Sequence, residues 1–295
     1  MKHGLFAFYA ICISCIPTIT FSYINQSHLY HARLFPGENR FAYNNLSSLT
    51  FQAAGDSTTK RLNNQGETIT APSGQRRYRY HQSNFIFEHN FSKNIFAGFN
   101  FPYARLIIEE SDNNISYKKK FINNPTFNVG WTQSSQCWSW ADFVNFTVES
   151  GLVIPAESIN SNAWGMPLSG KCALGIYDWV TLGVQSDVTI FSNKHNKACW
   201  NLCTYFKADH LMRGLSLLLG YSYSTQEKTP TQWETAPSQQ FTSWNRWTCH
   251  FALSYDFACT MHPHAPHIEF CYNKAISGKN IIDNSLIGFQ LGAEF

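Results

Sequence analysis

Charged residues are scarce in this sequence. Asp, Glu, Lys and Arg together make up 14% of the 295 residues, whereas an average soluble domain contains about 25%. The formal net charge is only +3 and no Lys/Arg-rich tract occurs, so a nucleic-acid partner is not expected. We interpret Lys118, Lys119 and Lys120 as part of a solvated loop. A chain with so few charges cannot form the mixed-charge surface of an ordinary soluble globule.

Long apolar runs are missing too. After the N-terminus, no segment approaches the roughly 18 consecutive apolar residues of a membrane-spanning helix. Aromatic residues nevertheless make up 16% of the chain. Few charges, many aromatic residues and no long apolar run are typical of a transmembrane β-barrel, in which lipid-facing and interior residues alternate along each strand.

Motifs for metal binding and catalysis are also missing. After the first 22 residues, no CxxC, HExxH or GxSxG pattern occurs, so we expect no metal, no cofactor and no enzymatic activity. His250 has Ser254 on the same face of its predicted strand, about 13 Å away at about 3.3 Å per residue, which is beyond hydrogen-bond reach. Lipid hydrolysis therefore remains only a minor alternative.

The cysteines do not form the pattern of a disulfide-stapled domain. Two of the nine lie in the first 22 residues. The others form an odd, widely spread set that we interpret mostly as lone apolar residues: Cys137, Cys172, Cys199, Cys203, Cys249, Cys259 and Cys271. Cross-links through Cys137 or Cys259 are the minority interpretation.

The N-terminus has the pattern of a secretory signal peptide. A short basic start precedes an apolar run and small residues, so we predict cleavage after Ser22 and export of the protein. Residues 23–45 show no clear period. We interpret them as a periplasmic lead-in or a plug, and residues 23–295 as one domain.

Alternation of apolar and polar residues, which is the period of a strand, recurs along the rest of the chain. It predicts twelve strands near residues 46–54, 79–91, 95–108, 126–132, 141–154, 171–176, 179–191, 197–208, 215–225, 244–257, 267–274 and 285–295.

The connections between these strands sort by length. Long polar loops at 55–75, 109–120, 155–167 and 226–240 alternate with tight turns such as 92–94, 177–178 and 209–214. A membrane barrel does this because its loops are long outside and its turns short in the periplasm. We therefore predict an all-β fold, a single transmembrane antiparallel up-and-down β-barrel of about 12 strands, with both termini periplasmic.

The last eleven residues carry a resemblance to a known class. Apolar side chains at Phe289, Leu291 and Phe295 alternate with polar residues and glycines, and the sequence stops on an aromatic residue. This resembles the closing strand of bacterial outer-membrane β-barrel proteins, in which it is the signal read by the barrel-assembly machinery. Gln290 stands where that class usually has Gly. The resemblance implies an outer-membrane location and contact with outer-membrane lipid.

A weaker resemblance rests on two segments. Residues 94–103 and 149–155 each place Pro after an apolar residue at the predicted end of a strand. They resemble segments of twelve-stranded barrels described as transporters of the phenol-degradation meta-pathway type. This implies transport, without naming a substrate.

On each predicted strand, charged residues fall on the face opposite the apolar face. The apolar face is expected to contact lipid, so the charged face becomes the interior of the barrel. The predicted lumen-lining residues are Glu88, Glu149, Lys171, Asp187, Lys207, Arg246, His250 and Glu269, with Asp256 beside them. They could simply fill the interior as paired charges, or they could line a path for a small solute. We therefore expect a passive pore or transporter for small polar or aromatic solutes. The alternative is a structural or adhesive surface barrel with a sealed lumen.

Overall fold

The computed structural model describes a large part of the chain. The described residues are 39–48, 51–52, 60–62, 68–70, 76–110, 115–135, 141–156, 163–176, 179–192, 198–230, 241–257, 266–279 and 285–295. The predicted signal peptide and residues 23–38 lie outside these ranges, as do Cys137, Cys259 and the predicted turn 177–178.

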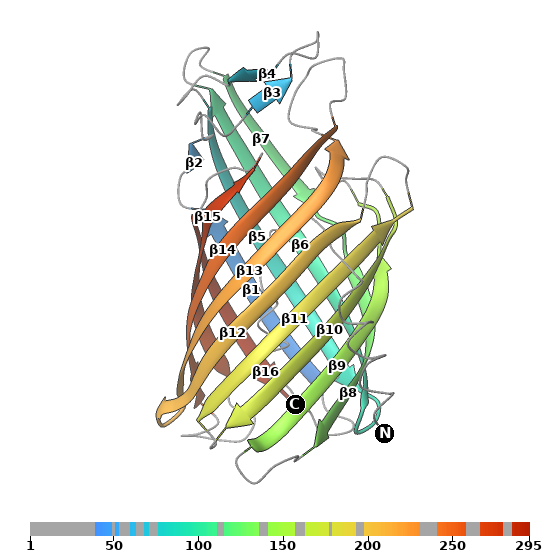
Figure 1. Ribbon diagram of the computed structural model, residues 1–295, viewed down its shortest axis with the longest axis vertical. Helices are drawn as coiled ribbons and strands as arrows, with labels where there is room; N and C mark the ends of the chain where they lie inside the picture. Colours follow the sequence, from blue (N-terminus) through green and yellow to red (C-terminus); the bar gives the residue numbers. More distant parts are fainter. Residues whose placement is uncertain are drawn as a thin grey trace.

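The structure is a closed antiparallel β-barrel (Figure 1). Its wall has twelve strand positions, one of which is shared by two strands, β7 (Ile115–Ile122) and β8 (Thr126–Ser135). The wall is formed by β1 (Asn39–Ser48), β5 (Arg76–Asn90), β6 (Ile95–Glu110), β7 continued by β8, β9 (Ala141–Val153), β10 (Gly165–Ile176), β11 (Val180–Phe191), β12 (Cys199–Met212), β13 (Leu215–Pro230), β14 (Phe241–Asp256), β15 (His267–Lys279) and β16 (Ser285–Glu294). The short β2 (Phe51–Gln52) extends the β1 position, and β3 (Lys60–Leu62) pairs with β4 (Thr68–Thr70) in a separate hairpin.

The first and last strands close the barrel. β1 pairs along one edge with β16 and along the other with β5. At the end of this seam the backbone amide of Asn39 donates to the carbonyl of Phe295 at 2.8 Å, and the amide of Phe295 donates back at 3.0 Å. This pairing leaves no open edge where the first and last strands meet, as a lipid environment requires. No helix in the described ranges is long and apolar enough to cross a membrane.

One wall position is interrupted. β7 pairs with the far half of β6 and β8 with its near half, so residues 123–125 break the strand opposite Pro102. Proline has no backbone N–H to donate, and a break in the neighbouring strand removes the need for one. The prediction that Pro102 ends a strand is therefore wrong, because β6 continues to Glu110.

The predicted loop 109–120 is wrong at residues 109–110 and 115–120, which belong to the paired strands β6 and β7, with Arg105 opposite Lys120 and Glu109 opposite Ser116. Residues 111–114 lie outside the described ranges. A strand is recognised in a sequence by alternating apolar and polar residues, and this alternation arises because one face of the strand is buried or contacts lipid. A hairpin that extends beyond the apolar outer band depends less on this period, because backbone hydrogen bonds also hold its strands together. Its polar sequence therefore resembles that of a loop.

Other strand boundaries also differ from the predictions. β1 begins at Asn39, so residues 39–45 are wall and not lead-in. β10 begins inside the predicted loop 155–167, β13 runs into the predicted loop 226–240, and β15 ends at Lys279. The predicted turn 92–94 is confirmed. β12 extends to Met212, and the next turn uses Gly214 at a φ of 84°, which glycine adopts without strain.

The two faces of the wall differ as the alternation predicts. Large apolar side chains are exposed outward all around the barrel, among them Phe85, Val129, Leu202, Leu253 and Ile287. Their neighbours along the strands point inward and are mostly buried and polar, such as Asn84, Asn201 and Ser254. An apolar exterior around a polar interior is the arrangement of a barrel that lies in lipid.

Candidate functional site

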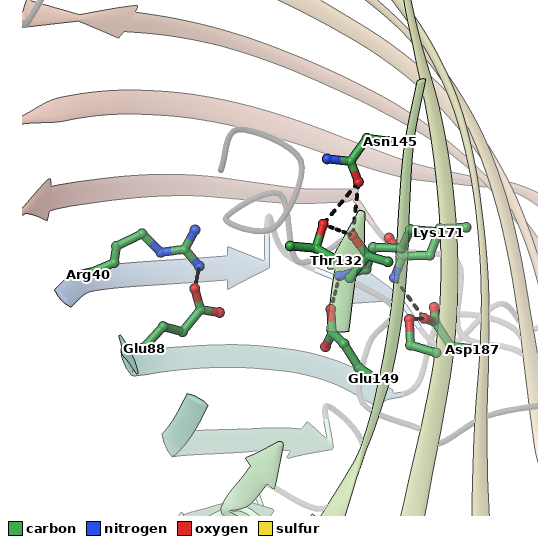
Figure 2. Close-up of polar contacts among 10 residues, drawn as sticks. Arg40, Glu88, Thr132, Asn145, Glu149, Lys171 and Asp187 are labelled. Carbon is green, nitrogen blue, oxygen red and sulfur yellow. Dashed lines mark hydrogen bonds and ion pairs between the residues drawn. The ribbon is translucent and has the colours of Figure 1, made fainter. Parts of the chain in front are cut away.

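The predicted lumen-lining residues lie on the inner face of the wall. Glu88, Glu149, His250 and Glu269 are buried, whereas Lys171, Asp187, Lys207 and Arg246 are half-buried. Asp256, by contrast, is exposed at the end of β14. Figure 2 shows several of these charges, with their partners, projecting from the wall strands toward one another. Whether they line a solute path remains a prediction.

Ion pairs between neighbouring strands hold part of this set. Lys171 Nζ on β10 lies 2.5 Å from Glu149 Oε1 on β9. Arg40 on β1 pairs with Glu88, its cross-strand partner on β5 (Figure 2). Lys207 pairs with Asp209 two residues further along β12. Desolvated charges of this kind need a partner of opposite sign.

Two of these partners were missed at the sequence level. Arg40 falls in the segment predicted to be a lead-in, and Asp209 in a predicted turn. Asp209 also accepts hydrogen bonds from the hydroxyls of Thr181 at 3.2 Å and Ser216 at 3.1 Å. The extension of a strand into a polar segment again explains both omissions.

Asp187 is held by neutral donors. Its carboxylate accepts hydrogen bonds from Ser169 at 2.8 Å, from the side-chain amide of Gln185 at 2.7 Å and from that of Asn201 at 2.8 Å. Ser224 in turn donates to Asn201 at 3.0 Å. These hydrogen bonds join β10, β11, β12 and β13, so they fix a negative charge in place on the inner face.

His250 belongs to a hydrogen-bonded row across three strands. Its Nε2 lies 2.7 Å from the Ser222 hydroxyl on β13, and its Nδ1 lies 2.7 Å from Asn273 Oδ1 on β15. An amide oxygen only accepts, so Nδ1 carries the proton and Nε2 accepts from Ser222. The order serine, histidine, amide matches a nucleophile with its base and orienting group.

The row lacks access for a substrate, however. Ser222 is 1% exposed and its two partners are also buried, so its hydroxyl is enclosed by the chain. From the sequence, Ser254 on the same strand was the hydroxyl predicted to share a face with His250. The partners that lie within reach are its cross-strand neighbours, which the pairing of β13, β14 and β15 selects.

Along the inner face, several aromatic rings occupy the space beside a glycine. A Cβ at Gly183 would lie 1.9 Å from Cζ of Tyr205, and one at Gly130 would lie 2.2 Å from Cζ of Phe96. The same arrangement joins Gly175 with Phe143 and Gly292 with His267. Phe96, Phe143 and His267 lie at or near the first residues of β6, β9 and β15, and Tyr205 lies near the middle of β12. Glycine is required there because any side chain would occupy the space of the ring.

Three further observations concern metals, cysteines and the C-terminus. The described ranges contain no group of three or more His, Cys, Asp or Glu side chains that could hold a metal ion. Cys172, Cys203, Cys249 and Cys271 form no disulfide within the described ranges. Phe295 is 59% exposed, and Leu291 is also exposed outward. Phe289 is half-buried and contacts the Phe270 ring, with centroids 5.3 Å apart.

A closed barrel of twelve antiparallel strands, apolar outside and polar inside, defines the class: the chain has the fold of the bacterial outer-membrane β-barrel proteins. Among solved structures, it is similar to the COG4313 outer membrane channel from Pseudomonas putida F1. The TM-score is 0.65 at 8% sequence identity, over 89% of this chain and 97% of that one. At this identity the similarity shows the fold alone.

Two other structures are less similar. The translocator domain of the autotransporter NalP from Neisseria meningitidis has a TM-score of 0.45 at 10% identity, over 92% of this chain and 91% of its own. OccAB4 from Acinetobacter baumannii has a TM-score of 0.41 at 6% identity, over 90% and 99%. No protein-family model and no curated protein sequence matches the chain.

Proposed function

We propose that this protein lies in the bacterial outer membrane as a passive pore or transporter for small solutes, with both termini in the periplasm. The observation that carries this is the polar inner face. It presents charges of both signs, each held by neighbours, within a wall whose outside is apolar. A path for a polar solute needs such groups, fixed so that they do not collapse onto one another.

The aromatic rings on the inner face support an aromatic component in the solute. Phe143 is half-buried on the inner face, whereas Tyr205, Phe96 and His267 are buried there. Aromatic rings favour offset or edge-on contact with another ring. The solute class we propose is therefore small and polar or aromatic.

A sealed structural barrel is the second candidate. Arg40, Glu269 and Gln290 are 0% exposed, so the interior beside the β1–β16 seam is filled. A barrel that is filled in the same way throughout would serve as a wall or a surface scaffold. Hydrolysis is not proposed, because Ser222 is enclosed.

The terminal strand supports a proposal about assembly. Leu291 and Phe295 present exposed apolar side chains on the outer face of β16, and Phe289 lies on the same face. We propose that these three residues form the signal bound by the barrel-assembly machinery.

Solute flux into vesicles tests the transport function. The full chain is refolded into liposomes, and swelling is compared for a small sugar and for an aromatic carboxylate of similar size. Swelling above that of protein-free vesicles is expected for both solutes, with the aromatic solute favoured. Vesicles that remain tight to both would support the sealed barrel instead.

A further inference from the structure

The outer face of the barrel carries a cluster of cations on three adjacent strands. Arg79 and His81 lie on β5, Arg105 on β6, and Lys118 and Lys120 on β7. Arg79, Arg105, Lys118 and Lys120 are exposed and His81 is half-exposed. We call these five residues the basic patch.

The pairing register places these cations in rows. His81 lies opposite Arg105, and Arg105 lies opposite Lys120. The next row on the same face contains Arg79 and Lys118, with Ile107 between them. Like charges directly opposite each other destabilise a sheet. Among the described residues, no carboxylate forms an ion pair with Arg105, Lys118 or Lys120. Arg105, Lys118 and Lys120 are therefore the cations of the patch that are available to an anionic ligand.

Acidic residues follow on the same hairpin, but further from the membrane. Glu109 and Glu110 lie opposite Arg77 and Arg76 in the register, four and five residues beyond Arg105. On β5, His81 Nδ1 lies 3.0 Å from the Ser47 hydroxyl. The register places Glu109 one row beyond the two rows of the patch.

The height of the patch matches a lipid headgroup region. Along β6, outward apolar residues run from Ile95 through Phe99 to Tyr103, and Arg105 is the next outward side chain. Ten residues at about 3.3 Å each, on a strand tilted by about 40°, rise about 25 Å along the barrel axis. This is the height of the apolar band of such barrels. Exposed Tyr103 and Ile122 lie directly below the cations.

β7 lies at the end of the barrel opposite the C-terminus (Figure 1). In the proposed topology this end faces the outer leaflet. We infer that the basic patch binds the phosphate groups of a phosphorylated glycolipid in that leaflet. The cations lie directly beside the apolar outer band of the barrel. In a phosphorylated lipid the phosphates likewise lie directly beside the acyl chains, so the two arrangements match. This inference rests on the proposed membrane location and topology, but not on conduction.

Binding of diphosphoryl lipid A in micelles tests the inference. The full refolded chain in neutral detergent is titrated with the lipid, and complexes are counted by native mass spectrometry. The Lys118→Gln/Lys120→Gln variant removes two patch charges. The matched control, Lys93→Gln/Arg213→Gln, removes two exposed charges from turns at the other end. Heat-modifiable migration on gels verifies that both variants are folded.

We expect the patch variant to bind about 10-fold more weakly or worse, and the control to bind like the original protein. Monophosphoryl lipid A should bind more weakly than the diphosphoryl form, and salt should weaken both. Equal binding by the two variants would overturn the inference. So would inorganic phosphate that displaces the lipid at equal concentration, since the patch would then be a simple anion site. Because no current is measured, failure here leaves the pore proposal untouched.

Discussion

The pair formed by Glu149 and Lys171 allows a quantitative prediction. The two side chains meet at 2.5 Å, with 6% and 10% of their surfaces exposed. Removal of one partner leaves a desolvated charge with its main counter-charge gone. Replacing Lys171 with Met should therefore cost about 3–5 kcal/mol of unfolding free energy. Glu149→Gln should cost a similar amount.

Removal of both charges is expected to be milder. The double variant has no orphaned charge, so it should lie within about 1–2 kcal/mol of the original protein, and the two single effects should be strongly non-additive. Urea unfolding in lipid vesicles, followed by tryptophan fluorescence, measures the free energies of the full cycle. Single effects below about 1 kcal/mol that simply add would show that water screens the pair, and the interior would then be wider and wetter than described.

Further changes probe the other parts of the structure. Phe295→Asp should lower the yield of folded, heat-modifiable protein in the outer membrane, and an unchanged yield would argue against an assembly signal at the terminus. Leu253→Arg, on the lipid face, should cost about 2–4 kcal/mol if it lies near the midplane; a neutral result in vesicle unfolding would contradict the assigned facing. Lys207→Glu removes the cation beside Asp209 and should make a conducting pore more cation-selective, which the reversal potential in a salt gradient reports. A fluorophosphonate probe should leave Ser222 unmodified, because the hydroxyl is enclosed; covalent labelling of that residue would reopen the hydrolase alternative.

The wall was predictable from the sequence because lipid contact forces a period of two. The outward positions of Leu253 and Leu291 and the inward positions of Glu149 and His250 follow from it. Where a strand leaves the apolar band, that constraint ends. The strand residues 109–110 and 115–120 therefore resemble a loop in sequence.

Cross-strand partners were not predictable. Asn273 lies opposite His250 only because β14 and β15 pair in one particular register, and Arg40 meets Glu88 only because β1 pairs with β5. Register depends on contacts distant in sequence, and a shift of one residue would turn every side chain to the other face. A single sequence therefore identifies the face on which a charge lies, but not its partner.

Single-channel recording of the refolded full chain in a planar bilayer tests the central claim most directly. We predict discrete current steps whose ion selectivity shifts toward cations in Arg246→Glu, because Arg246 lies on the inner face. The lipid-facing change Val129→Leu, on the outer face, should leave the selectivity unchanged. A correctly folded barrel that inserts into the bilayer and never conducts would contradict the pore and establish the sealed wall.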